Sequence, residues 1–113
     1  MDDCVFCRIA SGEIPSNKVY EDERLFAFRD IAPQAPTHIL IVPKKHLRNV
    51  LECAEDKALM ADVFELAAKL AKSEGLSENG FRLVTNCGKD GAQSVPHFHV
   101  HLLGGRPLSG QMA

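Results

Sequence analysis

The sequence predicts one α+β domain, with an antiparallel sheet of about five strands, one long helix and a short N-terminal helix. Three observations support this fold class. The 113 residues fit one ordinary domain, so residues 1–113 are expected to form a single unit. Hydrophobic residues make up 45% and charged residues 25%, as in globular proteins. Strand-like runs precede and follow one helical segment, without the strand and helix alternation typical of a parallel sheet.

The first half of the chain predicts the short helix and three strands. Residues 4–11 are expected to form the helix, and Gly12 ends it. Two β-prone runs, 18–21 and 25–29, flank a charged turn and indicate a hairpin. The unbroken apolar run 39–42 favours a buried central strand.

The long helix is expected over residues 55–74, where apolar side chains recur at the helical period before Gly75. These side chains cover roughly 160° of the helical wheel, wider than the ~100° stripe that packing on one surface requires. The additional apolar surface is expected to cover a wide sheet or to contact a second subunit. In the second case Met60 or Phe64, at one edge of the arc, lies at the interface of a homodimer.

Two more strands are expected at 81–85 and 98–103, joined by the loop 86–95. This loop contains glycines and short polar side chains, a composition that lets backbone N–H groups turn toward an anion. Lys89 adds a positive charge. Alone, such a loop would be an ordinary turn, but it leads directly into a strand rich in histidine.

Three of the five histidines, His97, His99 and His101, recur at every second residue. In a strand they share one face, while the apolar residues between them point into the core. Imidazole is a common metal ligand and also a side chain that exchanges a proton near neutral pH. The spacing therefore predicts a histidine cluster that serves either metal binding or catalysis. The preceding loop favours a phosphate held against an imidazole.

Composition argues against several classes of function. Thirteen Lys and Arg stand against fifteen Asp and Glu, a formal net charge of -2, so the basic excess of nucleic-acid binders is missing. No apolar run approaches the ~20 residues of a membrane helix. The acidic start does not resemble a signal peptide, so we expect a cytoplasmic protein. The cysteines at positions 4, 7, 53 and 87 are then expected to be reduced thiols.

The sequence resembles the histidine triad (HIT) family, and within it the Hint branch of purine nucleoside phosphoramidases. The matching segments cover nearly the whole chain: 6–9, 12–15, 30–38, 43–46, 91–94, the triad, and Leu-Gly-Gly-Arg at 103–106. The resemblance implies the HIT fold, a homodimer, and hydrolysis of adenosine or guanosine 5′-phosphoramidates to a nucleoside monophosphate and an amine. It implies no catalytic metal.

The resemblance also implies a role for each active-site histidine. His99 matches the nucleophile that attacks the α-phosphorus and forms a nucleotidyl-histidine intermediate. A backbone carbonyl near His97, the first histidine of the triad, fixes the other ring nitrogen of the nucleophile. His101 and His38 match histidines that contact the phosphate and manage the proton of the departing amine.

Other positions match groups that hold the nucleotide. Asn86, Gln93 and Ser94 lie in the loop that binds the phosphate oxygens and the leaving group. Asp30 matches the carboxylate that accepts the ribose hydroxyls, and the apolar slot for the base matches Phe6, Ile9, Phe28 and Ile31. Without the resemblance, Asp30 would be an ordinary turn residue and the apolar side chains would be core.

Two departures from the family pattern bear on function. Ala92 stands where glycine is usual, so a positive φ there would strain the loop. The tail 107–113 lacks the tryptophan of many relatives, which leaves the leaving-group preference open.

The Cys4-x-x-Cys7 pair is a separate question. On its own it is either two inert thiols in a small helix or half of a metal site. Other HIT branches place zinc on such a pair plus two histidines, which here are His46 and His97. Two thiolates and two imidazoles would form a closed structural zinc site.

Two other functions stay open at this point. The first is dinucleoside polyphosphate hydrolysis by the same triad, as in the Fhit branch, although the Gly-Ala-Gln-Ser and Gly-Gly-Arg segments favour Hint. The second is a non-enzymatic nucleotide-binding or zinc-binding module that regulates a partner protein.

Overall fold

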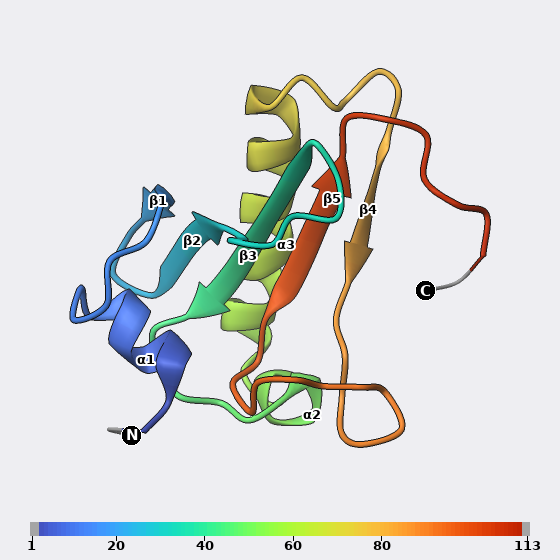
Figure 1. The fold of residues 1–113 in the computed structure, drawn as a ribbon. Helices are drawn as coiled ribbons and strands as arrows, with labels where there is room; N and C mark the ends of the chain where they lie inside the picture. Colours follow the sequence, from blue (N-terminus) through green and yellow to red (C-terminus); the bar gives the residue numbers. More distant parts are fainter. Residues whose placement is uncertain (1–2, 112–113) are drawn as a thin grey trace.

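The structure is a computed structural model that describes residues 3–111. Its centre is a five-stranded antiparallel sheet in the order β1-β2-β3-β5-β4 (Figure 1). The strands are β1 Lys18–Glu21, β2 Leu25–Arg29, β3 Thr37–Pro43, β4 Phe81–Val84 and β5 Val100–Gly104. The predicted fold class, α+β with an antiparallel sheet, is confirmed.

Three helices accompany the sheet: α1 Val5–Ala10, α2 Val50–Cys53 and α3 Lys57–Ser73. The predicted stop of α1 is present, because Gly12 follows the helix with φ of 84°. The sequence analysis did not predict α2. Its single turn is capped by the side chain of Asn49, and four residues are too few to show a helical period.

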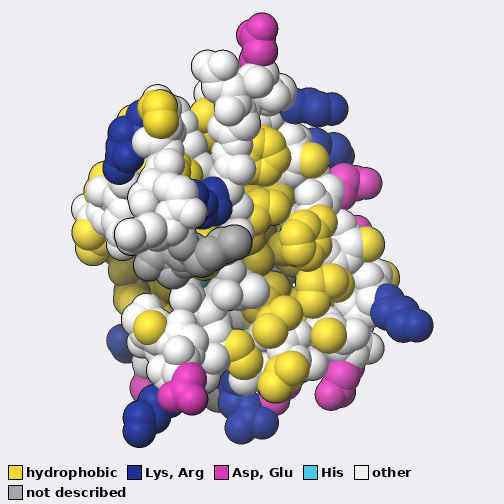
Figure 2. All heavy atoms as spheres, turned by 90° about the vertical axis from the view of Figure 1, so that its right-hand side faces the viewer, with side chains coloured by type: hydrophobic (Ala, Val, Ile, Leu, Met, Phe, Trp, Pro, Cys, Tyr) yellow, Lys and Arg dark blue, Asp and Glu magenta, His cyan; other side chains and the backbone are white. Residues whose placement is uncertain are grey.

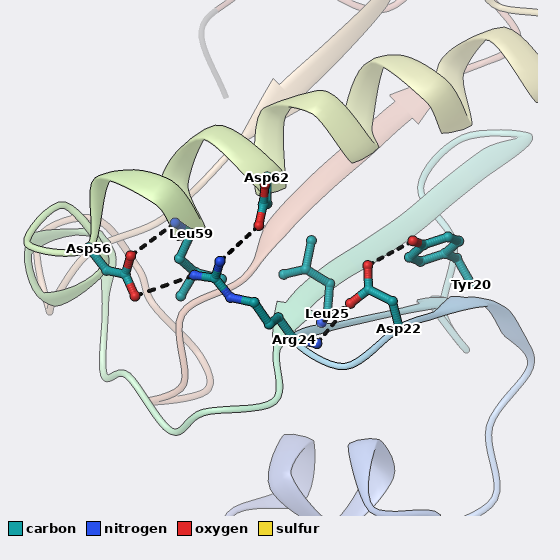
Figure 3. Close-up of polar contacts among 7 residues, drawn as sticks. All are labelled: Tyr20, Asp22, Arg24, Leu25, Asp56, Leu59 and Asp62. Carbon is teal, nitrogen blue, oxygen red and sulfur yellow. Dashed lines mark hydrogen bonds and ion pairs between the residues drawn. The ribbon is translucent and has the colours of Figure 1, made fainter.

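Charged side chains tie the start of α3 to the turn between β1 and β2 (Figure 3). Asp56 caps the helix, since its Oδ1 accepts the backbone N–H of Leu59 at 3.0 Å. Arg24 donates to Asp56 Oδ2 at 3.4 Å and to Asp62 Oδ2 at 3.0 Å. Asp22 in turn accepts the backbone N–H of Arg24 at 2.8 Å. These contacts fix the position of α3 relative to the hairpin.

Apolar clusters cover both faces of the sheet. Helix α3 lies on the face behind the sheet in Figure 1, and α1 packs on the other face. Neighbouring residues of β3 alternate between the two clusters: Ile39 and Ile41 belong to the α3 side, Leu40 and Val42 to the α1 side. Every residue of β3 is buried, as expected for the central strand.

The last strand begins later than predicted. The expected strand 98–103 is found at Val100–Gly104, because the N–H of Phe98 bonds to the carbonyl of Leu47 and lies outside the β3–β5 ladder. The alternation of side chains nevertheless holds through this irregular segment. Phe98 and Val100 join the core under α3, while His97 and His99 are buried on the α1 side.

The long helix leaves one edge of its apolar arc uncovered. Leu66 and Leu70 are buried against the sheet, whereas the side chain of Phe64 is 51% exposed. The apolar surface that the width of the arc predicted to be left uncovered by the sheet is therefore found at Phe64. Within residues 3–111, no helix has the length and apolar character needed to cross a membrane.

Candidate active site

Four histidines gather where β3 and β5 lie side by side. His99 and His101 have ring centroids 5.0 Å apart, and His38 of β3 lies 5.2 Å from His101. His97 precedes them on the same face and is fully buried, as are His99 and His38 within a few per cent. The alternation predicted from the sequence thus places the triad rings on one face, next to a fourth ring from the neighbouring strand.

His99 presents one unprotonated ring nitrogen. Its Nδ1 lies 2.7 Å from the carbonyl oxygen of His97, and a carbonyl can only accept, so Nδ1 carries the proton. Burial lowers the pKa of His99, which keeps the ring neutral. Phe6 packs edge-on against this ring at 5.0 Å between centroids. The Nε2 atom of His99 therefore holds a free lone pair, the form that a nucleophile requires.

The His38 and His101 rings have a defined order of protons. The backbone N–H of Gln34 donates to His38 Nδ1 at 3.1 Å, so the proton of neutral His38 is on Nε2. That Nε2–H donates to His101 Nδ1 at 2.9 Å, which leaves the proton of His101 on Nε2. Burial, followed by the neighbouring rings of His99 and His38, lowers the pKa of His101 to about 4. His101 is therefore a neutral donor through Nε2.

Asp30 stands beside this histidine pair. Its Oδ1 accepts the N–H of Ala32 at 2.8 Å, and its Oδ2 lies 3.5 Å from His38 Nε2. The carboxylate and the rings of His38 and His101 are close enough to surround a cation. However, His38 Nε2 carries a proton in the order just described. The cluster is therefore a hydrogen-bonded pair of neutral histidines beside a carboxylate, and His38 Nε2 has no free lone pair for a cation.

Cys4, Cys7, His46 and His97 form a candidate zinc site. Tetrahedral zinc with bonds of about 2.3 Å to sulfur and 2.0–2.1 Å to nitrogen would separate neighbouring sulfur and nitrogen ligands by about 3.6 Å. The Sγ atom of Cys4 lies 3.3 Å from His97 Nδ1, and that of Cys7 lies 3.3 Å from His46 Nδ1. These distances fit the metal with little adjustment.

The tautomer of His97 also fits a metal. Its Nε2 lies 2.8 Å from the carbonyl oxygen of Pro43, so Nε2 carries the proton and Nδ1 faces the thiols as a bare nitrogen. Burial, and then the neighbouring Cys4 thiol, raise the pKa of Cys7 to about 11. Binding of zinc would therefore displace a proton from this thiol.

The loop 86–95 is held by its own side chains. Asn86 Nδ2 donates to the carbonyl of Gly91 at 2.7 Å. Gln93 Oε1 accepts the N–H of Gly88 at 3.0 Å, and its Nε2 donates to the carbonyls of Arg48 at 2.7 Å and Val95 at 2.9 Å. All groups of the Gln93 amide thus bond to backbone, whereas Ser94 is exposed.

The loop meets the condition under which the sequence analysis expected strain at Ala92. Ala92 has φ of 57° and is the one residue other than glycine with positive φ within residues 3–111. Gly91 is needed for a different reason: a Cβ there would lie 2.5 Å from the carbonyl oxygen of Cys87.

The residues assigned to the base slot are only partly together. Phe6, Ile9 and Phe28 are buried in the cluster beneath α1, and the rings of Phe6 and Phe28 meet at 5.6 Å. Ile31 is fully exposed in the loop before β3. Phe6 therefore contacts the ring of His99, and Ile9 and Phe28 share its cluster, while contact between Ile31 and a base stays a prediction.

The sequence matches the family model of the HIT domain over residues 11–108. The chain belongs to the HIT family. This HIT protein is 46% identical over 113 residues to the purine nucleoside phosphoramidase of Escherichia coli strain K12, covering 99% of this chain and 95% of the relative. It is 52% identical over 108 residues to the 14 kDa zinc-binding protein of Zea mays, with coverage of 93% and 84%. It superimposes on a histidine triad protein from Clostridium difficile with TM-score 0.94, 45% identity and coverage of 99% and 98%.

Several groups that organise this HIT site were not found from the sequence. They are the N–H of Gln34, the carbonyl of Pro43 and the hydroxyl of Thr85, which donates to the carbonyl of His99 at 2.8 Å. Two of the three are backbone groups, and no residue type identifies them. The Thr85 hydroxyl could have been found only as a polar side chain at the end of a predicted strand.

Proposed function

We propose that this HIT protein is an enzyme that hydrolyses purine nucleoside 5′-phosphoramidates to a nucleoside monophosphate and an amine. The observation that carries the proposal is the hydrogen bond of 2.7 Å from His99 Nδ1 to the carbonyl of His97, which leaves Nε2 ready to attack phosphorus. The relative from Escherichia coli, named a purine nucleoside phosphoramidase, supports the same reaction over dinucleoside polyphosphate hydrolysis.

In the first step His99 Nε2 attacks the α-phosphorus while the bond from phosphorus to nitrogen breaks. The electron pair of that bond leaves with the amine nitrogen, which takes the proton of His101 Nε2. His38 Nε2–H remains bonded to His101 Nδ1 and stabilises the electron-rich ring. His101 gains negative charge as it gives up this proton, and His99 gains positive charge as it binds phosphorus. Their ring centroids are 5.0 Å apart, so these opposite charges stabilise each other.

In the second step water attacks the same phosphorus and the bond from phosphorus to His99 breaks. One proton of the water returns to His101 Nε2, and the hydroxyl completes the nucleoside monophosphate. The histidines thereby regain their starting protonation, and the net reaction consumes one water. No metal takes part in either proposed step.

Nucleotide binding is assigned to the surroundings of the histidines. Asp30 accepts the ribose hydroxyls, and the cluster beneath α1 supplies the apolar wall for the purine. Backbone N–H groups of the loop 86–95 hold the phosphate, with Asn86 and Ser94 beside them. Gln93 contributes by fixing the shape of this loop, since its amide bonds to three backbone groups.

The test of this function is His99→Ala with an adenosine 5′-phosphoramidate as substrate. The variant should lose at least a hundredfold in kcat, about 2.7 kcal/mol of barrier, and should still bind adenosine monophosphate. Rapid quench of the wild type should trap a nucleotidyl-protein that the variant does not form. A wild type that binds the nucleotide without turning over the substrate would instead favour a non-enzymatic binding module.

We also propose that Cys4, Cys7, His46 and His97 hold a structural zinc ion. The separations and tautomer described above support the site, as does the likeness to the zinc-binding protein of Zea mays. Such a metal would join α1 to the segment that carries the triad and would contribute to folding. None of the four cysteines forms a disulfide, which supports a reducing location, the cytoplasm.

We further propose a homodimer formed by β4 and α3. Strand β4 lies at one edge of the sheet, and hydrophobic side chains gather on the side of the molecule seen in Figure 2. The side chains of Phe64 on α3 and Phe81 on β4 are 51% and 42% exposed. A two-fold axis beside them would bury both in a self-complementary contact and would pair the two β4 edges.

A further inference from the structure

The turn after β5 packs tightly on the loop that precedes β3. Gly104 pairs with Thr37 in the β3–β5 ladder. Gly105 follows with φ of 99°, and a Cβ there would lie 2.8 Å from the Cβ of Pro36. Arg106 then reaches back to the loop, where its Nη2 donates to the carbonyl of Gln34 at 2.8 Å. The backbone of Gln34 is thus held by a side chain from the turn that follows β5.

Gln34 is also the residue whose N–H sets the proton order of the histidine pair. Its N–H donates to His38 Nδ1, and His38 Nε2 then donates to His101 Nδ1. If Gln34 moved away, neutral His38 could carry its proton on Nδ1 and accept at Nε2. His101 would then donate through Nδ1, and its Nε2 would reach the substrate without a proton.

We propose that Arg106 is a positioning residue for the leaving-group step. It holds Gln34 so that the proton of His101 stays on Nε2, where the departing amine can accept it. The inference rests on the proposed phosphoramidase function. It predicts that loss of Arg106 lowers kcat most for substrates whose leaving group must be protonated as it departs.

Two substrates that share the adenosine monophosphate moiety separate this effect from a general loss of structure. An alkylamine phosphoramidate must be protonated as it leaves, whereas the p-nitrophenyl ester leaves as a stable anion. Arg106→Ala should lower kcat for the phosphoramidate about tenfold, a part of the 10²–10⁴ that a positioned acid supplies. The kcat for the ester and both KM values should change less than about twofold, and Arg106→Lys should recover most of the loss.

Arg82→Ala is the matched control. Arg82 also donates from Nη2 to a backbone carbonyl, that of Ser109 in the tail, and it makes no contact with the loop before β3 among the hydrogen bonds of the described residues. This variant should leave the kcat values of both substrates unchanged. Equal losses on the two substrates in Arg106→Ala, or the same selective loss in Arg82→Ala, would overturn the assignment.

A second measurement does not depend on turnover. In protein labelled with ¹⁵N histidine, the Nδ1 atoms of His38 and His101 should have the chemical shifts of unprotonated nitrogen, and those of Nε2 the shifts of protonated nitrogen. Arg106→Ala should mix the two tautomers. Unchanged tautomers in this variant would refute the role of Arg106. A wild type with the expected tautomers but without phosphoramidase activity would refute only the proposed function.

Discussion

Replacement of Ala92 by glycine is expected to stabilise the protein. Ala92 has φ of 57° and is exposed, so the change removes no buried contact and relieves a conformation that disfavours a Cβ. The left-handed conformation costs a residue with a Cβ roughly 1–2 kcal/mol. Glycine gives back about 0.4–1 kcal/mol, because the unfolded chain gains conformational freedom. The difference predicts a net gain of about 1 kcal/mol in the free energy of unfolding.

The same chemical change in α3 should have the opposite sign. Ala68 lies on the exposed side of that helix, where Ala68→Gly costs about 1 kcal/mol. The two single substitutions should therefore differ by about 2 kcal/mol although each removes one methyl group. Urea denaturation followed by circular dichroism, at one fixed zinc concentration, measures both values. If Ala92→Gly destabilises the protein as much as Ala68→Gly does, the loop does not require positive φ at this position.

Four further results are expected. Asp30→Ala should weaken the binding of ribonucleotides more than that of 2′,3′-dideoxy analogues, and equal losses in a calorimetric titration would remove the ribose assignment. Cys4→Ser should lose about one zinc per chain by elemental analysis and melt at a lower temperature, whereas a metal-free wild type with the same melting curve would indicate inert thiols. Phe64→Glu should shift the mass in sedimentation equilibrium from two chains toward one without unfolding. Burial lowers the pKa of His38 and lowers that of His101 to about 4. As the pH falls, these histidines therefore bind protons in the unfolded state before they do so in the folded state, which favours unfolding. Stability should be full above about pH 6.5 and decline toward pH 4, and a flat profile by urea denaturation would contradict this.

Features that depend on local sequence could be predicted. The two strands of the first hairpin were predicted at the positions where they are found, because each is a short β-prone run beside a charged turn. Strain at Ala92 could be raised only as a condition, because glycine is usual at that position in the HIT family, and the positive φ itself is seen only in the structure. The face shared by His97, His99 and His101 also followed, since alternation is a property of extended backbone even where no ladder forms.

Features that depend on distant backbone groups could not be predicted. The late start of β5 is caused by a hydrogen bond from Phe98 to Leu47, about fifty positions away in the chain. The tautomer of His38 depends on the N–H of Gln34, and that of His97 on the carbonyl of Pro43. Every residue except proline has such an N–H, and every residue has such a carbonyl. Only the folded chain selects which of them meets a histidine.

His97 shows how such backbone groups join two sites in one residue. Its Nδ1 faces the Cys4 thiol at 3.3 Å, its Nε2–H bonds to Pro43, and its carbonyl accepts from the His99 ring at 2.7 Å. A ligand bound to Nδ1 would fix the ring, and the ring and the carbonyl belong to the same buried residue. The candidate zinc site therefore holds the group that sets the tautomer of His99. Loss of the metal should lower kcat as well as stability, so activity lost in a cysteine variant is no sign that the thiol takes part in the reaction.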